Sequence, residues 1–189
     1  AVGAPLLVND GEIARHKIAL PMLDIHTIGA GGGSIGWLDP GGMLRMGPQS
    51  AGADPGPACY RRNGPATITD CNVVLGRIPA DRFPHVFGPA GDQPIDPTAS
   101  RARLAELAAA ARDEAGLEYS VEALAEAFLQ VACARMANAI RELALHHGED
   151  PARFGLLSFG GAAGQHACAV AGLLGADEVL LHPLAGVLS

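Results

Sequence analysis

The sequence predicts an α/β fold in which a mixed sheet, flanking helices and long loops rich in proline and glycine are combined. Three observations lead to this fold class. Apolar segments of strand length enter and leave a glycine-rich loop at residues 27–34. A second glycine-rich loop, residues 160–166, lies between an apolar strand and an apolar helix. Between the loops, apolar residues recur at the three- and four-residue spacing of amphipathic helices.

The first loop contains three consecutive glycines, Gly31, Gly32 and Gly33, followed by Ser34. Because glycine has no Cβ, its backbone can turn through positive φ and approach a ligand closely. Successive exposed N–H groups in such a turn form a concave anion site. We therefore expect these four residues to hold phosphate groups. An ordinary hairpin turn with surplus glycine is the alternative.

The second loop contains Gly160, Gly161 and Gly164 and leads through His166 into an apolar helix. A helix N-terminus presents free N–H groups and favours a phosphate or a polar ligand edge. The spacing matches neither a Walker A loop nor Gly-x-Gly-x-x-Gly. Two such loops favour a nucleotide site that is divided between them, although His166 could instead cap its own helix.

Bulk properties exclude several classes of protein. The net charge of the 189 residues is −7 without a basic run, which argues against a nucleic-acid partner. No apolar run approaches the roughly 20 residues that a membrane helix needs. The four cysteines form no Cys-x-x-Cys pair, so we expect reduced thiols and a cytoplasmic protein rather than a zinc site or a disulfide framework.

The first half is expected to consist of strands and loops. Residues 1–19 suggest a strand region, and residues 20–28 a strand that enters the first glycine loop. A turn at residues 39–42 predicts a hairpin between Ile35–Leu38 and Met43–Met46.

Two long loops follow, residues 47–65 and 77–97, separated by a short helix. That helix is predicted over Cys71 to Leu75, with Asp70 as its N-cap. Asp54, in the first of these loops, is interpreted from turn chemistry as a turn-capping residue.

The second half is expected to be helical. Asp96 and Pro97 predict the start of a helix that ends at Gly116, and Ser120 caps the next helix, which closes at His146. Arg135 interrupts the apolar stripe of the second helix, and a buried ion pair is the interpretation we favour for it. Strand 155–159, helix 164–174 and strand 178–182 then predict a βαβ unit with parallel strands.

Several motifs in the correct order resemble the hydantoinase A/5-oxoprolinase family over nearly the whole chain. Within it, three shorter stretches are similar to the long single-chain 5-oxoprolinases (61–65, 87–94 and 164–169). The family motifs lie at residues 24–34, 47–60, 69–72, 159–166 and 183–189.

The resemblance implies part of an actin-like (ribonuclease H-like) ATPase domain, in which residues 1–97 carry the first glycine loop and residues 98–189 the second. It implies ATP-dependent opening of 5-oxoproline to glutamate. The motif at the end continues into more protein in the family, and an earlier phosphate loop is missing. We therefore expect a single partial domain whose partners are the remaining domains of the same polypeptide, with a homo-oligomer also compatible. Alone, it would be inactive.

The resemblance also implies site residues. Gly31, Gly32, Gly33 and Ser34 would hold the β- and γ-phosphates, while Gly160, Gly161, Gly164 and His166 would lie on the adenosine side. Asp24 and His26 would meet a divalent metal such as Mg²⁺, its waters or the transferring phosphate, and Asp54 is a second candidate metal ligand. Many actin-like ATPases have an aspartate where this chain has Gly29, so Asp24 or His26 would substitute for it, or the metal would be held from outside this chain.

Three alternatives stay open. Two belong to the same family: an enzyme that opens hydantoin, and an ATP-dependent ketone carboxylase. The third is a non-catalytic module that binds nucleotide or only contacts neighbouring domains.

Overall fold

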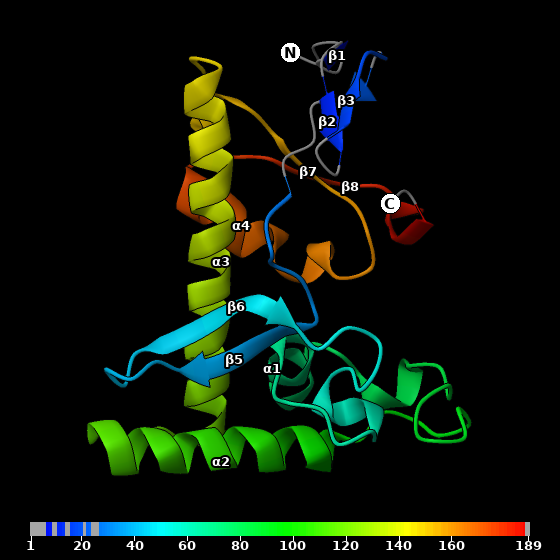
Figure 1. Cartoon of the computed structure of the whole chain (residues 1–189), viewed down its shortest axis with the longest axis vertical. Coiled ribbons are helices and arrows are strands. Elements are labelled where there is room, and N and C mark those ends of the chain that lie inside the picture. Colours follow the sequence, from blue (N-terminus) through cyan, green and yellow to red (C-terminus); the bar gives the residue numbers. More distant parts are fainter. Residues whose placement is uncertain (1–6, 9–10, 14–15, 21, 24–26, 188–189) are drawn as a thin grey trace.

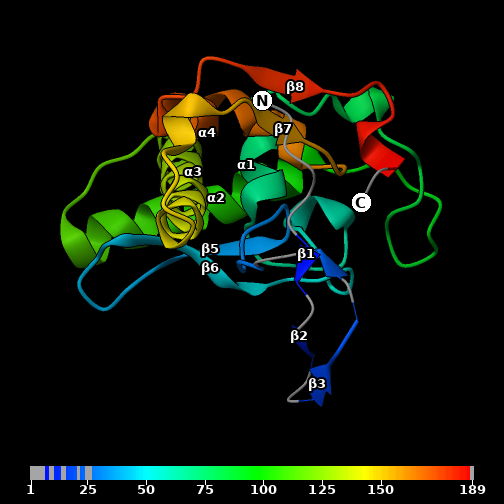
Figure 2. The same ribbon diagram turned by 90° about the horizontal axis from the view of Figure 1, so that it is seen from above.

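The computed structural model describes residues 7–8, 11–13, 16–20, 22–23 and 27–187. At its start, β1 (Leu7–Val8) pairs with β4 (Met22–Leu23), and β2 (Gly11–Ile13) pairs with β3 (His16–Ile18), both antiparallel. Figure 2 shows β2 and β3 projecting away from the helices. Within the predicted strand region at residues 1–19, the described residues 7–8, 11–13 and 16–18 therefore form short strands. Of the strand expected at 20–28, Met22–Leu23 forms a strand, whereas residues 20, 27 and 28 do not; residues 21 and 24–26 lie outside the described residues.

The predicted hairpin that follows the first glycine loop is confirmed, and it is longer than expected. Strand β5 (Ser34–Leu38) pairs antiparallel with β6 (Leu44–Ser50). Asp39 stabilises the turn, because its carboxylate accepts hydrogen bonds from the N–H groups of Gly41 (2.9 Å) and Met43 (3.0 Å). The hairpin thus fixes the direction in which the chain leaves the glycine loop.

Helix α1 (Ile68–Val74) begins three residues earlier than predicted, with Thr67 rather than Asp70 as its N-cap. The two residues form a capping box, in which the Thr67 side chain accepts from the Asp70 N–H and the Asp70 carboxylate accepts from the Thr67 N–H. Asp70 does cap this helix, but from the third helical position. Both residue types are good N-caps, so local sequence could not decide between them.

Two long helices meet at the lower end of the molecule in the view of Figure 1, and their predicted caps are confirmed. Asp96 caps α2 (Pro97–Ala115), which ends at Gly116 in the left-handed conformation, and Ser120 caps α3 (Val121–His146). The largest core cluster lies where α1, α2, α3 and β6 meet. Its members include Met46, Ile68, Leu104, Leu124, Phe128 and Leu129.

The prediction that Arg135 forms a buried ion pair is wrong. Arg135 is exposed on α3, and its guanidinium donates to the backbone carbonyl of Met46 in β6. A long side chain can reach water from the border of an apolar face, so a charge there needs no buried partner.

The predicted βαβ unit is confirmed. Strand β7 (Leu156–Ser158) pairs in parallel with β8 (Val179–Leu181), and α4 (Ala167–Leu174) connects them. Helix α4 packs on α3 through Cys133, Ala137, Val170 and Leu174. Among the described residues, the strands form four separate two-stranded sheets. Short 3₁₀ helices occupy Ala58–Tyr60, Ala80–Arg82, Pro151–Arg153, Ala163–Gln165 and Ala185–Val187.

Candidate functional site: two glycine loops

Protein donors hold the carbonyl oxygens of all three consecutive glycines in the first glycine loop. The carbonyl of Gly31 accepts from the Ser34 N–H (2.9 Å), and that of Gly33 accepts from the Ala51 N–H (2.8 Å). The carbonyl of Gly32 accepts twice from Thr69, from its N–H (2.9 Å) and from its hydroxyl (3.0 Å). The Ser34 hydroxyl also accepts from the Gly31 N–H (3.0 Å). This loop is therefore rigidly shaped, although it consists of glycine.

The N–H groups of Gly32 and Gly33 have no hydrogen-bond partner among the described residues. Two adjacent N–H donors without a protein acceptor are the feature that an anion-binding loop requires. The predicted phosphate role of this loop is therefore chemically feasible.

Close packing, rather than positive φ, accounts for glycine in the first loop, since none of its three glycines is among the residues with positive φ. A Cβ on Gly32 would lie 2.8 Å from the Thr69 hydroxyl oxygen, and one on Gly33 would lie 2.7 Å from the Ser50 hydroxyl oxygen. A Cβ on Gly31 would meet nothing within 4 Å. Gly32 and Gly33 are thus the sterically restricted positions.

The second loop turns at Gly160, whose φ is +91° and whose N–H donates to the Ala185 carbonyl at 2.7 Å. Here the left-handed conformation explains the glycine. A Cβ on Gly161 would meet nothing within 4 Å, and one on Gly164 would lie 3.7 Å from the Leu181 side chain. Among the described atoms, nothing excludes a side chain at these two positions.

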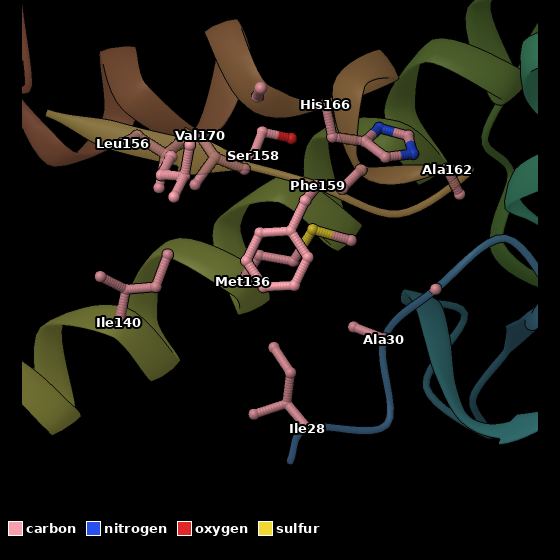
Figure 3. A pocket seen from close by; sticks show the side chains of 14 residues that line it. Ile28, Ala30, Met136, Ile140, Leu156, Ser158, Phe159, Ala162, His166 and Val170 are labelled. Carbon is pink, nitrogen blue, oxygen red and sulfur yellow. The ribbon is translucent and has the colours of Figure 1, made fainter. Parts of the chain in front are cut away.

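The structure brings the two loops together. A Cβ on Gly32 would lie 3.7 Å from the Cβ of Ala162 in the second loop. Beside this contact lies a cavity of about 310 Å³, shown in Figure 3. Ile28 and Ala30 line it from the first loop, and Met136 and Ile140 line it from α3. The second loop and the elements beside it contribute the other labelled residues: Leu156, Ser158, Phe159, Ala162, His166 and Val170.

Two buried polar side chains in this cavity lack partners. His166 is 3% exposed, and neither ring nitrogen has a hydrogen bond among the described residues; the Ser158 hydroxyl is likewise buried and unpaired. His166 stands at the N-cap position of α4 but makes no side-chain capping bond, so the alternative that it caps this helix is not confirmed. Burial, and then the positive charge of Arg77, lower the pKa of His166. A neutral imidazole both donates and accepts, so it could meet a polar ligand edge.

The candidate metal ligands are not gathered in the described part of the chain. Asp24 and His26 lie outside the described residues, and Asp54 is exposed in the loop after β6. Nowhere in the described ranges do three or more His, Cys, Asp or Glu side chains form a group that could hold a metal ion. The donor set for a divalent metal is therefore not found among these residues.

Three further residues were not predicted as site residues. Thr69 holds Gly32, Ser158 lines the cavity, and Asn72 is fully buried with neither side-chain amide atom bonded to another described residue. A serine two residues before Gly160, at the end of the strand that enters the second glycine loop, is a signal that the sequence did offer. Thr69 and Asn72 share one face of α1, but only the folded chain shows that Thr69 faces the first loop.

A comparison with protein families gives a match over the whole chain. The family model described as hydantoinase/oxoprolinase matches residues 1–189. The chain belongs to this family. As a member of the hydantoinase/oxoprolinase family, it is 45% identical over 182 residues to 5-oxoprolinase PfmaA of Pestalotiopsis fici and 44% identical over 173 residues to the 5-oxoprolinase of Saccharomyces cerevisiae. The alignments cover 96% and 91% of this chain, but only 14% and 13% of those relatives.

Two solved structures of larger chains are similar in fold. The ATP-dependent caprolactamase from Pseudomonas jessenii matches 96% of this chain with a TM-score of 0.78 and 34% identity, over 25% of its own length. The nucleotide-free structure of acetone carboxylase, described in terms of ATP-dependent acetone carboxylation, matches 96% of this chain with a TM-score of 0.75 and 27% identity, over 24% of its own length. The predicted fold class is thereby confirmed.

None of the helices in the described residues is both long enough and apolar enough to span a bilayer.

Proposed function

We propose that this chain supplies part of the ATP site of an enzyme that opens a cyclic amide, with 5-oxoproline as substrate and glutamate as product. The observation that carries the proposal is the meeting of two glycine loops, one of which presents two unpaired N–H donors. The names of two relatives supply the reaction, since both are 5-oxoprolinases, at 45% and 44% identity.

The chemistry explains why ATP is needed. A five-membered lactam is a poor electrophile, because its carbonyl is stabilised by the amide nitrogen. Transfer of the γ-phosphoryl group to the carbonyl oxygen would release ADP and activate the carbon. Water would then attack that carbon and the C–N bond would break, with the nitrogen taking up a proton to become the amino group of the product. The acyl phosphate left behind would be hydrolysed by a second water to the carboxylate and phosphate. Phosphoryl transfer depends mainly on positioning and charge neutralisation.

In this scheme, the residues of the chain bind and orient the nucleotide. The N–H groups of Gly32 and Gly33 would donate to phosphate oxygens, with Gly31 and Ser34 shaping their loop. Gly160, Gly161 and Gly164 would lie on the adenosine side, with His166 and Ser158 available to polar atoms. The described residues offer no cluster for a divalent metal, so no step is assigned to one.

The partners and the cellular compartment of the enzyme are part of this proposal. Its partners would be the remaining domains of a longer protein, because this chain spans only 14% and 13% of those two relatives. Self-association stays a prediction. All four cysteines are free in the structure, which supports a reducing compartment such as the cytoplasm.

The test is an assay of the full-length protein that carries this chain. Phosphate release from ATP is measured with and without 5-oxoproline, glutamate is quantified in the same tube, and hydantoin, caprolactam and acetone with bicarbonate are run in parallel. Stimulation by 5-oxoproline with matching glutamate is the expected result. Turnover with another compound instead would move the protein to that activity, and silence with all of them would leave a nucleotide-binding or interdomain module.

A further inference from the structure

We propose that Thr69 is a positioning residue for the phosphate loop: its hydroxyl fixes the Gly32–Gly33 peptide so that the Gly33 N–H faces a nucleotide phosphate. The proposal rests on the proposed function, since it names the residue that orients the donors of that same site. It goes further in assigning a role to a side chain that is 37 residues away in the sequence and is not itself a phosphate ligand.

The contact is specific. The Thr69 side chain and backbone both donate to the Gly32 carbonyl oxygen, at 3.0 Å and 2.9 Å. The hydroxyl stands so close to Gly32 that a Cβ there would lie 2.8 Å from it. Backbone bonds of the neighbouring segment add to this attachment, because the Gly36 N–H donates to the Ala66 carbonyl at 2.9 Å.

Peptide geometry connects this contact to the ligand. In a trans peptide, the carbonyl of one residue and the N–H of the next point in opposite directions. Holding the Gly32 carbonyl on the side of α1 therefore points the Gly33 N–H away from α1. Glycines on both sides of this peptide offer little resistance to its rotation, so the loop alone would not maintain that orientation.

Thr69 can act as a fixed point because the start of α1 is anchored in the protein interior. The fully buried Asp70 carboxylate accepts from the N–H groups of Ala58 (3.0 Å) and Cys59 (2.9 Å) and from the Ser100 hydroxyl (2.6 Å), in addition to the capping box. This network ties α1 to the loop after β6 and to α2. Thr69, next to Asp70 in α1, is thus held in place by the capping box and by the bonds to the loop after β6 and to α2.

The experiment compares three variants of the full-length protein. Thr69→Val removes the hydroxyl and keeps the shape, Thr69→Ser keeps the hydroxyl, and Thr98→Val makes the matched change at an exposed threonine of α2 whose side chain makes none of the described hydrogen bonds. Affinities for ATP and for adenosine, which lacks phosphates, are measured by calorimetry. Hydrogen exchange of the segment 29–36 is followed without nucleotide.

Thr69→Val is expected to weaken ATP about three- to tenfold, the range for one net hydrogen bond, and to leave adenosine within about twofold. It should also speed exchange of the loop, with Thr69→Ser restoring both properties towards wild type. Only one of the two Thr69 bonds is removed, so a larger loss is not expected.

Other results would overturn the proposal. A Thr69→Val protein that matches Thr98→Val in ATP affinity and loop exchange would overturn the positioning role alone. Equal weakening of ATP and adenosine would show general damage rather than phosphate positioning. A wild-type protein that binds no ATP would overturn the proposed function and, with it, the phosphate role of Thr69, while the exchange comparison would still decide whether Thr69 holds the loop.

Discussion

Gly32 is the residue at which the first glycine loop, the second glycine loop and α1 come together. A methyl group at this position would displace the Thr69 hydroxyl from its hydrogen bond, because the two would be 2.8 Å apart. We expect Gly32→Ala to lower the free energy of unfolding by about 1–3 kcal/mol, as overpacking does, and Gly32→Asp to abolish ATP binding through charge and bulk.

The matched control is Gly31→Ala, where the added Cβ meets nothing within 4 Å. Its effect on unfolding should stay within about 0.5 kcal/mol. Thermal and urea unfolding of the full-length protein measure both substitutions, and nucleotide titration measures Gly32→Asp. Equal destabilisation by the two alanines would show that packing at Gly32 is not the restriction, and a Gly32→Asp protein that binds ATP as the wild type does would contradict the loop assignment.

Protonation of a single residue, His166, is expected to make the free energy of unfolding depend on pH. Burial, and then the Arg77 charge, which Glu126 partly offsets through a 2.7 Å ion pair, lower its pKa from the ordinary value of 6.5. Above pH 6.5 the ring is neutral in both the folded and the unfolded chain, so it contributes nothing. As pH falls below 6.5, the unfolded chain takes up the proton first, and stability is lost at up to about 1.4 kcal/mol per pH unit until the lowered pKa is reached.

His166→Gln, which keeps a donor and an acceptor but does not titrate, should therefore lose less stability than wild type between pH 7.5 and pH 5. Urea unfolding across that interval measures the difference. Parallel curves for the two proteins would show that the folded state does not resist protonation of His166.

At the scale of the element, α1 depends on a carboxylate that no amide can replace. All five groups that bond Asp70 are donors: the N–H groups of Ala58, Cys59 and Thr67 and the hydroxyls of Thr67 and Ser100. Asp70→Asn would turn one acceptor into a donor that faces other donors. We expect a loss of at least about 3 kcal/mol in unfolding free energy, since charged hydrogen bonds are lost and buried groups stay unpaired. Asp113→Asn, at an exposed position of α2, should change it by less than about 0.5 kcal/mol.

The elements also show what sequence can predict. The starts of α2 and α3 were predicted correctly because Asp96 and Ser120 cap them through bonds to residues two or three positions away. The predicted start of α1 was wrong, because Thr67 and Asp70 are both good N-caps. Which of them becomes the N-cap depends on the distant donors at residues 58, 59 and 100, which bond the Asp70 carboxylate. The glycine loops could be recognised from composition. The bond from Thr69 to Gly32, and the exposed position of Arg135 beside Met46, depend on segments far apart in the sequence.

At the scale of the whole molecule, the site exists only because the two glycine loops, which are far apart in the sequence, come together at Gly32 and Ala162. Beside this contact, Gly31 of the first loop and Ala162, Ala163 and His166 of the second line one cavity. A nucleotide that spans both loops must therefore protect them together. We expect ATP to slow hydrogen exchange of the segments 29–36 and 159–168 in the full-length protein at the same ligand concentration. The segment 104–112 of α2 does not line the cavity and should exchange at an unchanged rate.

Comparison of ATP with adenosine then assigns the two halves of the ligand. Phosphates held by the first loop should make the protection of 29–36 depend on ATP, whereas protection of 159–168 should persist in part with adenosine. Protection of only the second loop by ATP would mean that the phosphates lie elsewhere and that the unpaired Gly32 and Gly33 N–H groups serve another ligand. Because folding alone brings the loops together, joint protection would tie nucleotide binding to the arrangement of the whole chain rather than to either motif.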